Sequence, residues 1–139
     1  MPTNTAVTDT HDQVHRSRST SVARWAARVL LAALGAFGIG ATVYFSFYAS
    51  PEDGGVVYAV DWLVAAWALG IFVGYLYTAV KLGDRTRRSV RMAQGFVLAH
   101  VVFGLVKLIG YGETSAVVFF AQDAGLLPVL AVAGRRADR

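Results

Sequence analysis

The chain has 139 residues, of which 55% are apolar and 16% are charged, and its mean hydropathy is +0.49. A soluble globular domain carries about 25% charged residues, so this composition argues against a water-soluble fold and favours one that lipid solvates. The absence of cysteine excludes disulfides, thiolate chemistry and cysteine metal sites.

Residues 1–23 are rich in Thr, Ser, Asp and His and poor in apolar side chains, so we expect a disordered cytoplasmic tail there. Four apolar runs follow, at about 25–48, 56–80, 92–110 and 115–133. A helix rises about 1.5 Å per residue, so each run is long enough to cross a hydrocarbon core of roughly 30 Å. The predicted fold is therefore all-α: a polytopic membrane protein with a four-transmembrane-helix bundle over residues 24–134.

The basic residues predict the orientation of this bundle. Twelve of the 13 Lys and Arg residues lie in the N-terminal flank, in the loop between the second and third runs, or in the basic C-terminus 135–139. A chain with four spans places these three segments on one side, which the positive-inside rule makes cytoplasmic. We therefore expect the protein in the cytoplasmic membrane, with both termini in the cytoplasm. The candidate contacts to anionic lipid headgroups are Arg85, Arg87, Arg88 and Arg91.

The first run has one alternative interpretation, a cleaved secretory signal, which would leave three spans and an external N-terminus. Its length of about 24 residues exceeds the usual apolar region of about 7 to 15 residues, so we expect the run to be retained.

Ionisable residues inside the predicted spans are Asp61, His100, Lys107 and Asp123. Such residues are costly in a bilayer and often functional. The third and fourth spans share a tight turn and should be antiparallel neighbours, and His100 and Asp123 lie at the same depth. We therefore expect these two side chains to face each other. The pair would either carry a proton or act only as a polar clasp between two helices, and the clasp is the favoured interpretation.

The third span also carries a polar stripe, because His100, Gly104, Lys107 and Tyr111 recur at spacings of four, three and four. Such a face could line an aqueous cavity, with Asp61 as the partner of Lys107. In the alternative interpretation, Lys107 only extends to the membrane surface. In the fourth span, Gly125 and Pro128 predict a kink beside Asp123.

Small residues recur every four positions in the first two spans and predict close helix packing, either inside one bundle or between copies. These residues are Ala32, Ala36, Gly40, Gly70 and Gly74.

No phosphate-binding loop, dinucleotide fingerprint, zinc-protease motif or hydrolase elbow occurs in the sequence. We therefore expect a non-enzymatic membrane component or accessory subunit, without cofactor or metal. The alternatives are a small oligomeric transporter or proton-coupled carrier that uses His100 and Asp123, and a quinone- or haem-associated membrane subunit. The expected partners are the lipid bilayer and either further copies of the chain or a larger membrane complex; nucleic acid is not expected.

Overall fold

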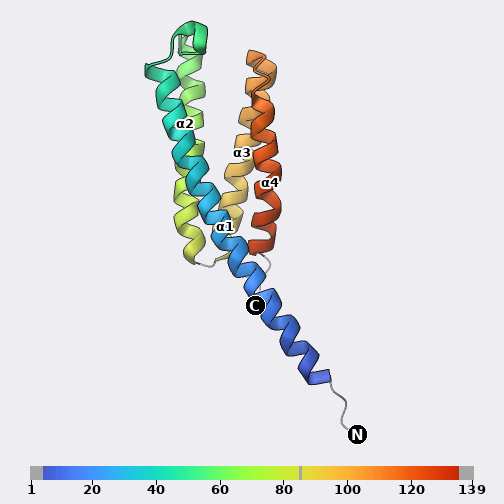
Figure 1. Ribbon diagram of the computed structural model, residues 1–139. Coiled ribbons are helices and arrows are strands. Elements are labelled where there is room, and N and C mark those ends of the chain that lie inside the picture. Colours follow the sequence, from blue (N-terminus) through green and yellow to red (C-terminus); the bar gives the residue numbers. More distant parts are fainter. Residues whose placement is uncertain (1–4, 85, 135–139) are drawn as a thin grey trace.

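The structure is a computed structural model that describes residues 5–84 and 86–134, with side chains described from residue 20 onward. Those residues form helices and connecting turns only (Figure 1). The long helices are α1 (Thr5–Phe47), α2 (Ala59–Lys81), α3 (Arg87–Tyr111) and α4 (Ala116–Gly134), and two short 3-10 helices cover Pro51–Asp53 and Leu82–Asp84. Among the described residues, four helices are long and apolar enough to cross a membrane. The all-α class and the four apolar helices predicted from the sequence are thus confirmed.

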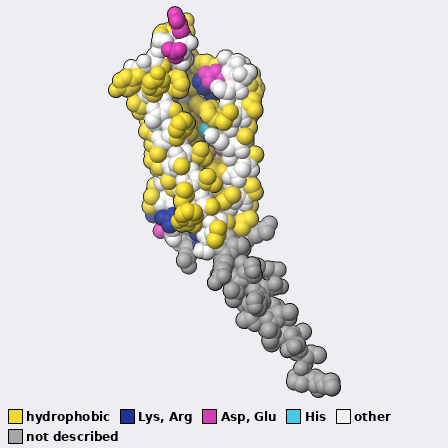
Figure 2. Space-filling view, viewed as in Figure 1, with side chains coloured by type: hydrophobic (Ala, Val, Ile, Leu, Met, Phe, Trp, Pro, Cys, Tyr) yellow, Lys and Arg dark blue, Asp and Glu magenta, His cyan; other side chains and the backbone are white. Residues whose placement is uncertain are grey.

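The four long helices form a ring in which each packs against two neighbours. Helix α1 packs against α2 and α4, and α3 packs against the same two helices, whereas the backbones of the diagonal pairs stay farther apart. We call the end formed by residues 48–58 and 112–115 the loop end, and the end formed by residues 82–84, 86–88 and 131–134 the basic end. Figure 2 shows acidic side chains gathered at the loop end. The two hairpins, α1–α2 and α3–α4, stand apart most clearly toward that end (Figure 1).

Helix α1 begins at Thr5, inside the segment 1–23 that the sequence predicts to be a disordered tail. The structure therefore differs from that expectation over residues 5–23; residues 1–4 lie outside the described part. Between residues 3 and 34 the chain has neither Gly nor Pro. The apolar span supplies the costly helical nucleus, and extending it toward the N-terminus adds one hydrogen bond per residue without any need for burial. The predicted cytoplasmic segment 135–139 also lies outside the described residues.

The basic half of the bundle holds the tightly packed core. Six large side chains there have less than 2% of their surface exposed: Leu31, Tyr75, Leu82, Val97, Leu126 and Leu130. Two arginines of α1 close this end. Arg24 donates to the Ala133 carbonyl oxygen at 3.1 Å, and Arg28 donates from Nε to the Ala79 carbonyl oxygen at 3.0 Å. They satisfy carbonyl groups at the C-terminal ends of α4 and α2, which have no partner within their own helices.

Close helix approach occurs at small residues, but not at all of the predicted ones. Ala36, Gly40 and Gly70 are exposed, and Cβ atoms added at the two glycines would meet nothing within 4 Å. Within one bundle these three positions make no close helix contact, so contact between copies stays the prediction for them, whereas Ala32 packs against the core and Gly74 lies against the ring of Phe96. The α1–α2 approach occurs instead at Gly35 and Gly38, where a Cβ would overlap Leu76 and Phe72. Three glycines fall in this part of α1, and spacing alone does not say which faces a neighbour.

Helix α4 continues through Pro128 as one helix, so it is not broken beside Asp123. Gly125 and Pro128 are both exposed on the outer surface of the bundle. The kink predicted at these two residues stays a prediction, because a helix can bend at a proline without ending there. A proline in a membrane helix removes only one backbone hydrogen bond, and the surrounding helix accommodates it.

Candidate functional site

His100 of α3 and Asp123 of α4 meet in the middle of the bundle. The imidazole Nδ1 lies 2.9 Å from Asp123 Oδ1, and each residue is 1% exposed. The antiparallel α3–α4 hairpin produces this contact, because the tight turn at 112–115 places both residues at the same depth. The contact predicted from the sequence is confirmed.

A third polar group, which the sequence analysis missed, completes this cluster. The hydroxyl of Tyr75 on α2 donates to Asp123 Oδ1 at 3.4 Å, and Tyr75 is fully buried. The cluster therefore joins α2, α3 and α4. Two of its polar atoms, His100 Nε2 and Asp123 Oδ2, are buried without a hydrogen-bond partner among the described residues. A buried polar atom without a partner lowers stability by about 1–3 kcal/mol. A bound ligand, a water molecule or a proton at these two atoms would remove that cost.

Aromatic rings surround the imidazole. Phe119 and Phe72 have ring centroids 5.1 and 5.5 Å from that of His100, and Phe103 stacks on it with an interplanar angle of 12° at 6.3 Å. Tyr75 approaches edge-on at 5.7 Å. Rings from α2, α3 and α4 thus hold the imidazole in one orientation and keep water from its edges.

A cavity of about 660 Å³ lies between the four helices in the loop half of the bundle. Small ligands bind in pockets of about 300–1,000 Å³, so this one has ligand size. His100, Phe72, Phe103 and Phe119 lie at its deep end, whereas Asp123 and Tyr75 do not line it. Figure 2 shows the surface hollowed near the loop end, with the histidine colour visible inside the hollow.

The wall of the cavity follows helical faces. On α2, Asp61, Ala65, Ala68 and Phe72 line it, at spacings of four, three and four. On α3, the predicted stripe lines it through His100, Lys107 and Tyr111, joined by Phe103. Gly104 does not line the cavity; it is buried against Phe120 of α4, where a Cβ would lie 3.2 Å from that ring. The sequence left two interpretations of this stripe open, and the structure has a cavity along it that Phe103 lines in place of Gly104.

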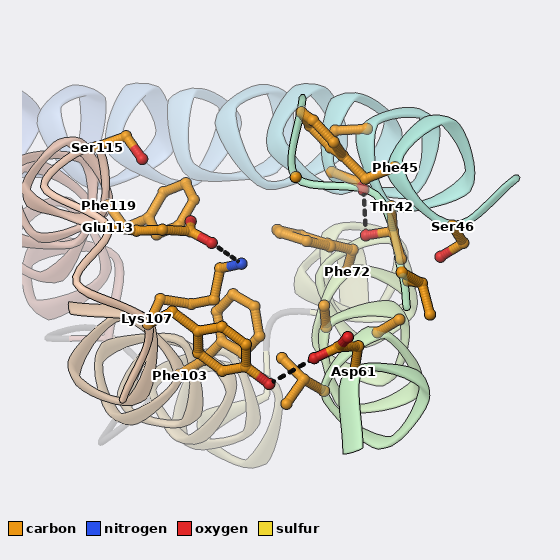
Figure 3. Close-up of a pocket in the computed structure, with 18 of the residues that line it drawn as sticks. Thr42, Phe45, Ser46, Asp61, Phe72, Phe103, Lys107, Glu113, Ser115 and Phe119 are labelled. Atoms are coloured by element: carbon orange, nitrogen blue, oxygen red, sulfur yellow. Dashed lines mark hydrogen bonds and ion pairs between the residues drawn. The ribbon is translucent and has the colours of Figure 1, made fainter. Parts of the chain in front are cut away.

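The rim of the cavity carries most of its charge (Figure 3). Lys107 forms an ion pair with Glu113, not with Asp61 as the sequence analysis suggested. Asp61 accepts a hydrogen bond from the Tyr111 hydroxyl at 3.0 Å and also bonds the backbone N–H groups of Val57 and Tyr58 at 3.1 and 2.8 Å. The carboxylate is therefore occupied at the start of α2, and Glu113, six residues after Lys107, is the nearer acid. The Lys107 ammonium also lies 5.1 Å from the centre of the Tyr111 ring.

The predicted headgroup contacts lie at the opposite end. Arg87, Arg88 and Arg91 begin α3 and are exposed, while Arg85 lies outside the described residues. No cluster of three or more His, Asp or Glu side chains suited to a metal occurs within residues 20–84 and 86–134.

Sequence reasoning missed the phenylalanines around His100 and the tyrosine below it. Phe72 and Phe103 are apolar residues in apolar helices, so no sequence signal separates them from lipid-facing ones. Tyr75 did carry a signal: a tyrosine inside a span needs a partner for its hydroxyl when it is buried.

Comparisons with known proteins do not assign the chain to a family. No family model matches the chain, and neither a curated protein nor a solved structure shows significant similarity to it. What the fold defines is a class: an all-helical chain whose four apolar helices suggest a membrane-spanning protein.

Proposed function

We propose that this protein is a non-enzymatic, multi-pass membrane protein that binds a small molecule in the cavity between its helices. It would act as the binding component of a larger assembly or as a carrier in its outward-open state. The observation that carries this proposal is the cavity of about 660 Å³ with His100 at its deep end, whose Nε2 has no partner among the described residues.

The orientation completes the proposal. With the arginines at the basic end on the cytoplasmic side, both termini lie in the cytoplasm and the cavity opens outward from the cytoplasmic membrane. The exposed apolar side chains of α1 to α4 face lipid in this arrangement, and the carboxylates of the loop end face the outer aqueous phase.

The closed basic half supports binding rather than free conduction. Leu31, Val97 and Leu130 are fully buried below the level of His100 and fill the axis of the bundle. A ligand that enters from the loop end therefore stops at the aromatic floor. Transport to the other side requires the helices of the basic half to move, as in alternating access.

The second candidate is a purely structural clasp, which the hydrogen bonds that join Asp123 to His100 and Tyr75 favour. A clasp explains why a carboxylate is buried between three helices. It does not explain a ligand-sized cavity above it, because the same clasp would form beneath a fully packed core.

Cysteine accessibility tests the proposal directly, because the natural chain has no cysteine. We would introduce single cysteines into the full chain and treat right-side-out membrane vesicles with a membrane-impermeant methanethiosulfonate. Ala65→Cys lies on the cavity wall and should react, and Ala41→Cys, on the α1 side of the same wall, provides a second site.

Two alanines give matched controls. Ala66 is the next residue of α2 and faces away from the bundle, and Ala93 is fully buried in the basic half. Cysteines at these positions should stay unmodified, since methanethiosulfonates need a thiolate and water to reach it. If neither cavity cysteine reacts faster than these controls, the cavity is not open to ligands and the clasp remains.

A further inference from the structure

The charges around the cavity are unbalanced. Among the described residues, three carboxylates line it, those of Asp53, Asp61 and Glu113, against the single ammonium of Lys107. The arginines described by the structure lie toward the other end of the bundle, where Arg24 and Arg28 bond to the ends of α4 and α2. A cleft lined by an excess of one sign raises the local concentration of the opposite sign, so the entrance favours cations.

A second, buried acid lies behind the deep end. Asp123 is 1% exposed, bonds to Nδ1 of His100, and keeps Oδ2 without a partner among the described residues. The cavity is therefore acidic at its mouth and beneath its floor, with an apolar stretch between. Ala65, Ala68 and Leu34 belong to that stretch.

The floor itself suits a cation. Phe72, Phe103 and Phe119 all line the cavity within 6.3 Å of the His100 ring centre. Aromatic faces attract ammonium groups, and more strongly when water is excluded. When a neutral imidazole donates its Nδ1–H to the Asp123 carboxylate, Nε2 carries a lone pair, and that nitrogen can accept a hydrogen bond from an N–H donor.

We propose that the cavity binds an amphipathic organic cation, a protonated amine attached to an apolar body of one or two rings. The ammonium lies at the aromatic floor beside His100 Nε2, and the apolar body fills the stretch above it. The surrounding rings close Nε2 off in the structure, so the amine enters by shifting the phenylalanine side chains. This inference rests on the proposed binding function and specifies the class of its ligand.

The first experiment measures charge selectivity in the Ala65→Cys protein in nanodiscs. A cationic and an anionic methanethiosulfonate are compared, and each rate is divided by its rate at Thr114→Cys, an exposed loop position that does not line the cavity. We expect the cationic reagent to be favoured at residue 65 by at least tenfold. Lys107→Gln removes an ammonium of the rim and should increase that ratio further. Equal normalised rates would overturn the proposal.

The second experiment uses protection by three probes that share a phenyl ring and a two-carbon chain. Phenethylammonium, 2-phenylethanol and 3-phenylpropionate are titrated against modification of Ala65→Cys by an uncharged methanethiosulfonate. The ammonium should protect at a concentration at least tenfold below either of the others. If the alcohol or the carboxylate protects as well or better, the cavity still binds small molecules but its ligand is not a cation. A different result would contradict the proposed binding function itself. In that result no reagent modifies the cysteine at residue 65, although Thr114→Cys reacts.

Discussion

The two halves of the bundle are built from the same apolar helices, but one half is tightly packed and the other encloses a cavity. In the basic half, large side chains fill the axis, and Arg24 and Arg28 bond to the last carbonyl groups of α4 and α2. In the loop half, the helices enclose a cavity of about 660 Å³, and small residues such as Gly38, Ala65 and Ala68 form part of its wall. The boundary between the halves is the layer of His100 and its aromatic neighbours.

This difference separates stability from binding. Packing contacts hold membrane helices together, because lipid is as apolar as the side chains it competes with. The basic half supplies most of those contacts, which leaves the loop half free to remain open. A substitution should therefore cost folding free energy in one half and alter ligand access in the other.

The largest effect is expected from leucines one helical turn apart on α1. Leu31 is fully buried in the basic half, whereas Leu34 lines the cavity. Leu31→Ala leaves a void in a closed core and should lower the free energy of unfolding by about 2–5 kcal/mol. Leu34→Ala only enlarges an existing cavity and should cost less than about 2 kcal/mol. Unfolding by sodium dodecyl sulfate in mixed micelles measures both. Equal losses would mean that the two halves are packed alike.

The next largest effect on stability is expected at Gly70 and Gly74 of α2, which the sequence predicts to be helix-packing positions. At Gly74 a Cβ would overlap the ring of Phe96, so Gly74→Ala must displace that ring or α3 itself and should cost about 1–3 kcal/mol. At Gly70 nothing lies within 4 Å, and Gly70→Ala should be neutral or stabilise by up to about 1 kcal/mol through helix propensity. The same unfolding measurement decides, and a loss at Gly70 would place an unseen helix, from a second copy, on that face.

The glycines show how much of the structure can be predicted from the sequence. Run length and composition predict the number and limits of the apolar helices, because crossing a bilayer demands a fixed length of apolar chain. Equal depth in a tight hairpin predicts that His100 meets Asp123. Neither argument gives the rotation of a helix about its own axis, since lipid and core are equally apolar and leave no amphipathic pattern. That is why Gly40 and Gly70 were placed in contacts, and why Phe72 and Phe103 were not seen as the walls of a site.

The third prediction tests the layer between the halves. Asp123→Asn keeps an oxygen for the His100 Nδ1 but removes the charge, and should lower the free energy of unfolding by about 0.6–2 kcal/mol, the range of polar contacts in membranes. Tyr75→Phe removes the longer bond, 3.4 Å against 2.9 Å, and should cost less. The double variant should lose less than the sum of the two, because both bonds share Asp123 Oδ1. Strict additivity would mean that the three residues do not form one network.

The charge of Asp123 also separates the clasp from the binding site. If the carboxylate attracts a cation, Asp123→Asn should weaken phenethylammonium protection of Ala65→Cys at least tenfold, while 2-phenylethanol protection stays unchanged. A clasp without a ligand would show the stability loss alone.

The smallest effect is expected at the rim, where Tyr111 and Asp61 join α3 to α2 by a hydrogen bond of 3.0 Å. Both groups reach water, so the bond competes with hydration, and Tyr111→Phe should cost only about 0.5–1 kcal/mol. The loss of this bond should affect the structure more than the small change in stability suggests. Within the described residues, this side-chain bond crosses the gap between the two hairpins at the loop end. Without it the hairpins should separate more readily, and Ala65→Cys should react faster in the Tyr111→Phe background. A variant as stable as the parent but with faster labelling shows that the rim limits entry; unchanged labelling assigns that limit to the aromatic floor.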